Sequence, residues 1–372
     1  MILSIAVILL FIAYSTVILF CWQSWKKIPP FKIPDKVQNE KISVVIAARN
    51  EEKNIKALLD SLKQQTYPAS DIIVCDDHST DNTAFIVKQF TDVALLQLKD
   101  DSLNSYKKKA IETAVNNASG ELIITTDADC ITQTSWLQAI AAFKNKYHSV
   151  FIAAPVSFLP SETNNKLLYN FQVLDFLVLQ GITGVSVHNK KLSMCNGANL
   201  AYEKWVFNDV NGFSDIDHIA SGDDMLLMHK IRKKYPDKVH YIKSKEAIVY
   251  TQAATSWKDF FNQRIRWASK ANKYDDKKIF WVLLLVYLFN FSFLILFMAG
   301  FRNYHYWLFA IALWIAKTIV EFPFVNSVAG FFGKKNLMKY FFVFQPLHIL
   351  YTIIAGWLGQ FGKYEWKGRR VK

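Results

Sequence analysis

Two aspartates directly after an apolar run are the residues of this chain best suited to chemistry. The run Ile123–Thr126 is apolar and β-branched and leads straight into Asp127-Ala128-Asp129, so we expect a strand that presents both carboxylates at its carboxyl end. Ligands bind at this edge in open α/β sheets. Such carboxylates can share a sugar hydroxyl and a hard divalent cation, Mg²⁺ or Mn²⁺, which would neutralise a diphosphate. A turn or N-cap role is the alternative.

Two more acidic pairs stand at the ends of predicted elements. Asp76 and Asp77 close the apolar run Asp71–Cys75, and Asp223 and Asp224 begin a predicted helix over 223–233. The dipole at a helix N-terminus favours ionised carboxylates. Helix capping is the alternative role for these pairs.

Three residues near the C-terminal third share one face of a predicted helix. Gln263, Arg266 and Trp267 are spaced i, i+3 and i+4, which places them side by side. An arginine can bind a pyrophosphate, and a tryptophan ring can stack on a sugar. The surrounding Ser256–Lys273 is basic and aromatic, as is typical of a helix at a membrane surface. The two interpretations are compatible.

Strands and helices alternate upstream of these residues. Ile42–Ala48, Asp71–Cys75 and Val93–Leu98 are predicted strands that precede the strand at Ile123. The intervening segments, 54–64, 83–90 and 106–117, carry helical patterns or caps. Right-handed crossovers then favour an α/β fold with a doubly wound, mostly parallel sheet, with every acidic strand end on one edge.

Composition separates the classes of protein to which the chain can belong. Of its 372 residues 52% are hydrophobic and 15% aromatic, which excludes a disordered chain. The net charge of +13 is compatible with nucleic acid. The aromatic residues concentrate in apolar runs at both ends of the chain, however, so we expect an anionic membrane as the partner and no nucleic acid. Four widely spaced cysteines without zinc spacing suit a reducing compartment.

Apolar segments at both ends predict transmembrane helices. Residues 1–20 contain no charge and are long enough to span, and Lys26 and Lys27 place the following residues in the cytoplasm. Three later stretches, about 279–299, 304–325 and 340–361, are also long enough. Three spans after the first would put the basic tail outside, against the positive-inside rule. Either the segment with Pro346 is interfacial or Met1 lies inside.

These boundaries give a domain plan for a multi-pass protein of the cell (inner) membrane. It comprises an N-terminal transmembrane helix (1–22), a linker (23–40), a cytoplasmic catalytic domain (41–254), an interfacial helix (255–278), a membrane region of two to three helices (279–362) and a basic tail (363–372). Within the membrane region, Lys317 and Glu321 are spaced i, i+4 and are predicted to form an ion pair. Residues 166–187 are apolar but contain Gln172 and Asp175. They predict a helix at the membrane face or beside an acceptor groove, with packing on the sheet as the alternative.

Six ordered motifs resemble those of glycosyltransferase family 2. They are SVVIAARNEE (43–52), VCDDHSTDNT (74–83), TDADC (126–130), CNGANLAY (195–202), SGDDMLL (221–227) and QRIRW (263–267). The resemblance is to the membrane-bound branch, which includes cellulose, chitin, hyaluronan and poly-N-acetylglucosamine synthases and ceramide glucosyltransferases. It implies a GT-A-type fold for the predicted sheet.

The resemblance also implies roles for individual residues. Those implied to contact the nucleotide sugar are Ala47, Arg49, Glu51, Asp77, Lys107, Asp127 and Arg266. Asp129 is the implied metal ligand, together with Asp127. Asp224 is the implied catalytic base with Asp223 in support, and the acceptor is implied to meet Asn196, Gly197, Gln263 and Trp267. One departure concerns Lys107, because Tyr106-Lys107-Lys108 stands where the family often shows Gly-Lys. Lys107 therefore either approaches the nucleotide or only begins a helix.

The function expected is inverting transfer of a sugar from a nucleotide-sugar donor, a UDP-sugar, to a growing polysaccharide or glycan, with Mg²⁺ or Mn²⁺. One alternative is transfer of a single sugar to a lipid acceptor. Another is a non-catalytic transport or assembly protein that only binds nucleotide sugar. Four predicted spans are few for a self-contained polymer channel, so an export or assembly partner is compatible with the first function.

Overall fold

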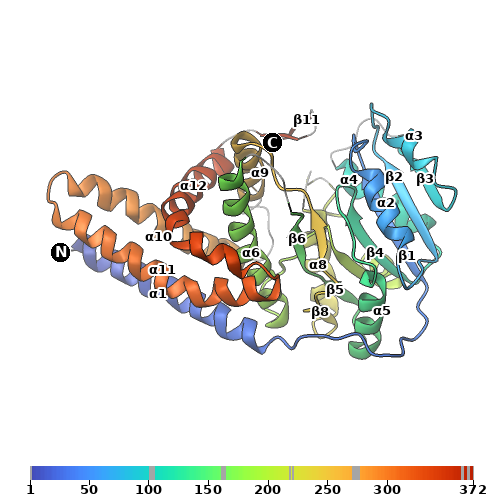
Figure 1. The fold of residues 1–372 in the computed structure, drawn as a ribbon, viewed down its shortest axis with the longest axis horizontal. Helices are drawn as coiled ribbons and strands as arrows, with labels where there is room; N and C mark the ends of the chain where they lie inside the picture. The colour runs from blue at the N-terminus through green and yellow to red at the C-terminus, as the bar shows by residue number, and fades with distance from the viewer. Residues whose placement is uncertain are drawn as a thin grey trace. The chain divides into compact units, whose positions relative to one another are not determined.

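The structure is a computed structural model that describes residues 2–99, 105–160, 165–217, 219, 222–269, 277–361, 364–366 and 369–371. It divides the chain into two compact units, each described here by itself. The sheet unit comprises Ile28–Pro160 and Ser186–Gln252, and the helical unit comprises Met1–Lys27, Ser161–Val185 and Ala253–Lys372. Figure 1 shows the strands of the first and the long helices of the second.

A mixed seven-stranded sheet forms the centre of the sheet unit, in the order β3-β2-β1-β4-β7-β5-β8. Its strands are β1 (Ile42–Ala48), β2 (Asp71–Asp76), β3 (Val93–Gln97), β4 (Leu122–Asp127), β5 (Phe151–Ala153), β7 (Leu200–Glu203) and β8 (Val239–Tyr241). Strands β1 to β4 are parallel, and β7 runs antiparallel to both β4 and β5. The predicted mostly parallel, doubly wound sheet is confirmed. Strands β6 (Val156–Phe158) and β9 (Val249–Thr251) pair separately.

The central strands are buried on both faces. Ile42, Val44, Val45 and Ile46 of β1 have no exposed surface, as expected for a strand that helices cover on both sides. The helices of this unit are α2 (Ile55–Lys63), α3 (Thr83–Val87), α4 (Tyr106–Asn117), α5 (Trp136–Tyr147), α7 (Lys204–Asp209) and α8 (Asp223–Lys234). Helix α3 is shorter than the predicted segment to residue 90, whereas α4 has the predicted bounds.

The proline-rich segment after residue 27 is fixed to the sheet unit. Phe31 donates its backbone N–H to Lys243 O (2.8 Å), and Ser244 Oγ donates to Phe31 O (2.9 Å). The Phe31 ring also meets Phe143 edge-on, with centroids 5.1 Å apart. The segment therefore has defined contacts along the body of this unit.

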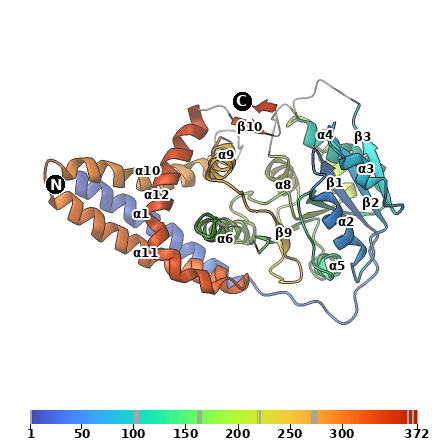
Figure 2. The same cartoon turned by 45° about the horizontal axis from the view of Figure 1, so that its top comes forward.

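Long apolar helices make up the helical unit. They are α1 (Ile2–Lys27), α6 (Lys166–His188, of which the part to Val185 belongs here), α10 (Lys277–Gly300), α11 (His305–Phe331) and α12 (Phe341–Phe361), with the shorter α9 (Trp257–Ala268) and the 3₁₀ helix η2 (Lys335–Tyr340). Helices α1, α10 and α11 lie side by side in both views (Figures 1 and 2), and α12 packs against α9 and α10. Two short strands, β10 (Tyr364–Trp366) and β11 (Arg369–Val371), follow.

Five helices in the described part of the chain are long and apolar enough to cross a membrane: α1, α6, α10, α11 and the segment Lys335–Gln360. Helix α6 differs from the others because 78% of its most apolar window is buried inside the protein. Its Phe171 packs on Phe260 of α9 and Phe344 of α12. This burial within the helical unit does not fit the predicted position on the membrane surface.

The predicted ion pair between Lys317 and Glu321 is confirmed. Lys317 Nζ lies 2.7 Å from Glu321 Oε1, and the lysine is fully buried. Gln345 of α12 joins the pair, since its amide accepts from Lys317 Nζ (2.6 Å) and donates to Glu321 Oε2 (2.6 Å). Tyr14 of α1 also donates to Glu321. Pairing offsets the high cost of burying these charges among apolar helices.

Candidate active site

The carboxyl ends of β1, β2 and β4 lie together, as their parallel pairing requires. Ala47 of β1 is in register with Asp127 of β4, and Ala48 with Asp76 of β2. The small side chains at the end of β1 therefore stand between the two acidic strand ends. This confirms the prediction that the acidic ends share one edge of the sheet.

Lys107 of α4 lies between two acidic groups: Asp127 at the end of β4 and Asp223 at the start of α8. Its Nζ lies 2.6 Å from Asp127 Oδ1 and 3.6 Å from Asp223 Oδ2. Burial of the ammonium opposes its charge, but the carboxylates of Asp127 and Asp223 outweigh burial and hold the pKa of Lys107 above its ordinary value. Lys107 thus stays charged at neutral pH, and it does more than begin a helix.

Asp223 and Asp224 form the first turn of α8 after Gly222, which has a φ of +81°. Both oxygens of Asp224 accept backbone N–H groups, Oδ2 from Gly197 at 3.0 Å and Oδ1 from Met225 at 2.8 Å. These bonds fix the orientation of the carboxylate. The predicted helix start is confirmed, and one aspartate faces Lys107 while the other is held by Gly197.

Gly197 stands where the predicted acceptor and catalytic residues meet. A Cβ at this position would lie 3.4 Å from Lys107 Nζ and from Asp223 Oδ2, and 3.6 Å from Asp224 Cβ. Asn196–Asn199 is a turn that precedes β7. Asn196 Oδ1 accepts from Ala198 N within this turn. The fully buried Asn199 instead ties Trp136 to neighbouring backbone carbonyls.

Arg49 and Asp77 lie together at the end of β1 and β2. Arg49 Nη1 donates to Asp77 O (2.8 Å) and lies 3.6 Å from Asp77 Oδ1. Asp77 is 4% exposed and Arg49 is 15% exposed at their side chains. The structure therefore brings together two of the residues that the resemblance places around the nucleotide.

The neighbouring Asp76 and Glu51 hold the loops around them by hydrogen bonds. Asp76 accepts from the Ser79 N–H at 3.4 Å, which supports the turn after β2. Glu51 accepts from the side-chain amide of Asn54 at the start of α2 (2.7 Å), and its own N–H donates to Thr83. Glu51, which the resemblance places at the nucleotide sugar, thus also holds this loop in place.

The loops after β1 and β2 brace each other. Asn50, with a φ of +52°, accepts from Thr80 N (2.8 Å), and Glu52 N donates to Asp81 Oδ2 (3.1 Å). Asn82 N in turn donates to Glu52 Oε2 (3.1 Å). Such reciprocal bonds fix the loops at this end of the edge without a regular element. The sequence signal for them was the run of capping residues in STDNT.

Asp129 follows β4 by two residues and faces β9. Thr251 Oγ1 donates to its Oδ2 (3.3 Å), and Cys130 Sγ lies 3.7 Å from its Oδ1. In the described part of the chain no group of three or more His, Cys, Asp or Glu side chains could hold a metal ion. Two carboxylates fit a hard cation that takes its other ligands from phosphate oxygens and water, as Mg²⁺ and Mn²⁺ do at phosphate sites.

Two residues beside the site have no predicted role. Thr251 donates to Asp129, and no short motif marks it. His78 directly follows Asp77, its Nδ1 lies 3.1 Å from Asp77 Oδ1, and its ring meets Tyr106 edge-on. The position of His78 inside VCDDHSTDNT was the available signal.

The cysteines are packed in the interior of the protein. All four are free and buried. Burial, with Asp76 and Asp77 adding to it, raises the pKa of Cys75 to about 12, and burial beside Asp129 raises the pKa of Cys130 well above its ordinary value. Neither thiol is a nucleophile at neutral pH.

Gln263, Arg266 and Trp267 belong to α9 of the helical unit.

Comparison with known proteins identifies a family for part of the chain. Residues 43–210 match the model of Glycosyl transferase family 2. The chain carries a family 2 glycosyltransferase domain. This domain contains β1, β2, β4 and α4, which build the edge described above. It confirms the resemblance drawn from the motifs. Asp223, Asp224 and α9 lie beyond the matched residues.

Curated relatives resemble parts of the chain. The poly(ribitol-phosphate) β-N-acetylglucosaminyltransferase TarS of Staphylococcus aureus is 34% identical over 112 residues, which are 29% of this chain and 20% of the relative. The UDP-Glc:α-D-GlcNAc-diphosphoundecaprenol β-1,3-glucosyltransferase WfgD of Escherichia coli is 32% identical over 158 residues, 41% of this chain and 56% of the relative. The chain therefore spans between a fifth and just over half of the length of these two relatives.

One solved structure resembles the chain along nearly its whole length. The mannosyltransferase PcManGT from Pyrobaculum calidifontis, in complex with GDP-Man and Mn²⁺, has a TM-score of 0.56 at 18% identity and covers 96% of this chain and 97% of its own. At this identity the likeness concerns the fold. It confirms that the family 2 domain has the GT-A-like fold.

Proposed function

We propose that this chain is a membrane-bound, inverting glycosyltransferase that moves a sugar from a nucleotide-sugar donor, a UDP-sugar, to a growing polysaccharide or glycan. The observation that carries the proposal is the cluster of Asp127, Lys107, Asp223 and Asp224 around Gly197, within a unit that carries a family 2 domain. A binding protein would need a donor site. It would not need a second acidic side held by a helix N-terminus.

The donor side of the proposed reaction uses the ends of β1, β2 and β4. The small Ala47 and Ala48 leave room for a base ring close to the backbone, and Asp77 accepts from a ring N–H of the base. Lys107 then offers a charged donor to the diphosphate, since its ammonium already lies at the acidic edge. These residues bind and orient the donor.

A divalent cation, Mg²⁺ or Mn²⁺, held by Asp129 and Asp127, would neutralise the charge of the departing diphosphate. The name of PcManGT, which was solved with Mn²⁺, supports this assignment. Thr251 would orient Asp129 by the hydrogen bond already present.

The acceptor side uses Asp224 as the general base. Its carboxylate takes the proton of the acceptor hydroxyl while that oxygen forms a bond to the anomeric carbon and the bond to the diphosphate breaks on the opposite face. The result is inversion at that carbon. Hydrogen bonds from Gly197 and Met225 hold the base in one orientation. Asp223 supports it by pairing with Lys107.

A second candidate is transfer of one sugar to a lipid acceptor. The five apolar helices support it, and so does WfgD, whose name gives a diphosphoundecaprenol acceptor. Product mass separates the two functions. A single added sugar on an extracted lipid supports the second candidate, and a ladder of masses spaced by one sugar supports polymer growth.

The test of the base is Asp224→Asn in protein purified in detergent, supplied with radiolabelled UDP- and GDP-sugars and Mn²⁺. We expect transfer to fall roughly 10²- to 10⁴-fold, the range of general base catalysis, while nucleotide affinity stays unchanged. Asp209→Asn is the matched control, because that aspartate lies in the same unit and pairs with Lys234. Full activity of the Asp224 variant would refute the mechanism. Donor binding without turnover in the wild type would support a transport or assembly protein instead.

A further inference from the structure

Helix α9 carries two arginines that face different ways. The resemblance implies roles for Arg266 and Trp267, whereas Arg264 of the same motif has no implied role. Arg264 is only 4% exposed and is buried inside the helical unit. Residues two apart on a helix do not share a face. The burial of Arg264 therefore needs an explanation separate from the roles implied for Arg266 and Trp267.

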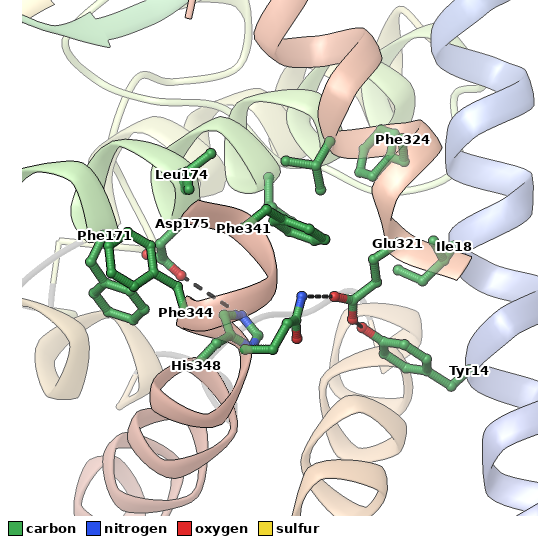
Figure 3. A pocket seen from close by; sticks show the side chains of 13 residues that line it. Tyr14, Ile18, Phe171, Leu174, Asp175, Glu321, Phe324, Phe341, Phe344 and His348 are labelled. Atoms are coloured by element: carbon green, nitrogen blue, oxygen red, sulfur yellow. Dashed lines mark hydrogen bonds and ion pairs between the residues drawn. The ribbon is translucent and has the colours of Figure 1, made fainter. Parts of the chain in front are cut away.

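Asp175 of α6 forms an ion pair with the guanidinium of Arg264. Its Oδ2 lies 2.5 Å from Arg264 Nη2, and the aspartate side chain is 3% exposed. Tyr351 of α12 also donates to Asp175, and His348 Nε2 lies 3.9 Å from it. Figure 3 shows Asp175 beside His348 at one end of a cavity of about 50 Å³, with Glu321 and Tyr14 at the other end. A cavity of this size holds only a few water molecules.

Arg264 in turn touches two residues of the motif. Its guanidinium carbon lies 4.3 Å from the centre of the Trp267 ring, within the range of a cation–π contact. Its Nη1 lies 3.4 Å from Gln263 Oε1. On the α6 side, Phe176 packs against Trp267 with centroids 6.3 Å apart. The orientation of the Trp267 ring is thus set by contacts that begin at Asp175 and its neighbour on α6.

A second contact fixes the start of α9 to the same helix. The side-chain amide of Gln172 donates to Ala254 O (2.9 Å) and accepts from Ala254 N (3.0 Å). Gln172 and Asp175 are three residues apart, so they lie on one face of α6. That face binds the segment before α9 and the middle of α9 at once.

We propose that Asp175 is a positioning residue for transfer: by holding Arg264 it fixes Trp267 and Gln263 in the geometry in which the motif works. The proposal rests on the proposed function, because the motif has work to do only if the chain transfers a sugar. It also explains why α6 carries polar residues in an otherwise apolar helix. A misplacement of the motif by about 1 Å is enough to lower a rate roughly a hundredfold.

The kinetic test compares two variants in the helical unit, each of which replaces a buried carboxylate by the amide of the same shape. Asp175→Asn leaves Arg264 buried without its counter-charge, and Glu321→Gln does the same to Lys317. We expect Asp175→Asn to lower kcat roughly ten- to hundredfold at saturating donor, with nucleotide affinity unchanged. Glu321→Gln should lower thermal stability similarly and keep kcat within about twofold of the wild type.

A double variant separates positioning from stability. Asp175→Asn with Arg264→Met removes both charges, so no buried charge remains unpaired and thermal stability should recover. The methionine does not replace the cation over Trp267, so kcat should stay low. Recovery of full kcat together with stability would overturn the proposal and leave the ion pair a purely structural role.

A readout that needs no activity keeps the two proposals distinguishable. Amide hydrogen exchange of residues 257–268, measured by mass spectrometry in detergent, should accelerate in Asp175→Asn and stay unchanged in Glu321→Gln. Equal exchange of α9 in both variants would overturn the positioning role even if transfer is observed. Faster exchange with no transfer in the wild type would refute the proposed function and leave the anchoring of α9 standing.

Discussion

At the scale of single residues, the site is a set of carboxylates that have their partners in place. Lys107 neutralises Asp127 and Asp223, and backbone N–H groups hold Asp224. A positive charge beside these carboxylates offsets their mutual repulsion. The lysine therefore links Asp127, the proposed metal-side residue, to Asp223, the neighbour of the proposed base.

The metal assignment predicts that two treatments have the same effect. Removal of divalent cations with EDTA, or Asp129→Asn, should reduce transfer by at least roughly tenfold, because the charge of the leaving diphosphate is then neutralised by Lys107 alone. Titration of Mn²⁺ in the presence of a nucleoside diphosphate, followed by electron paramagnetic resonance, should show weaker binding to the variant. Asp209→Asn is again the control. Activity and Mn²⁺ binding that survive in Asp129→Asn would remove the role given to Asp129.

A half-buried lysine outside the site, Lys243, gives a pH dependence with a defined sign. Burial lowers the pKa of Lys243 from 10.5 to about 8. Between these two values the unfolded chain binds the proton more tightly than the folded chain, so stability should rise with pH across this window. The penalty of burying the ammonium is fully present below the lower value.

The variant Lys243→Met should therefore be more stable than the wild type at pH 7, and its advantage should shrink as the pH rises through the window. Thermal unfolding from pH 7 to 10.5 measures the difference. The exposed Lys245→Met serves as the control and should show no such trend. An advantage that stays constant with pH would mean that the ammonium of Lys243 carries no burial penalty.

At the scale of elements, the approach of β1 and β4 depends on a glycine. A Cβ on Gly120 would lie 2.5 Å from Ser43 N and 2.8 Å from the Ile42 carbonyl carbon, and these are backbone atoms that cannot move aside. Gly120 N also donates to Ser43 Oγ (2.7 Å). The pairing of these strands sets the register between Ala47 and Asp127, so this contact positions the acidic edge.

The same glycine-to-alanine substitution should therefore affect stability at Gly120 and transfer at Gly197. Gly120→Ala should destabilise the fold by about 1–3 kcal/mol through overpacking. Gly197→Ala meets ordinary contacts of 3.4 Å, so its stability should change little, while its methyl group beside Lys107 and Asp223 should lower transfer. Thermal unfolding and transfer assays on both variants test the contrast. A large loss of stability only at Gly197 would contradict the contacts described here.

At the scale of the whole molecule, the helical unit carries the long apolar helices and the basic residues that flank them. Lys26 and Lys27 end α1, and the tail 363–372 contains five further basic residues: Lys363, Lys367, Arg369, Arg370 and Lys372. Basic segments stay in the cytoplasm by the positive-inside rule. We therefore predict that the tail lies on the same side of the membrane as Lys27.

This topology predicts the behaviour of fusions at Lys372. Green fluorescent protein should fluoresce there, and alkaline phosphatase, which needs the oxidising side, should be inactive. Fusions after Lys27 give the cytoplasmic reference. An active phosphatase at Lys372 would place the tail outside and would require Lys335–Gln360 to span fully.

The sequence alone determined most of the fold and the identity of the acidic residues. Apolar runs, helical spacing and six motifs depend on local order along the chain, so they predicted β1 to β4, α4, the apolar helices, and Asp127, Asp129, Asp223 and Asp224 as the site. Only the tertiary structure decided what lies between distant segments. Lys107 bridges two acidic sides 96 positions apart, Asp223 and Asp127. Thr251 reaches Asp129, and the polar residues of α6 hold α9 rather than face a membrane surface. These contacts arise from packing between elements, and no local pattern records which partner a buried polar side chain will meet.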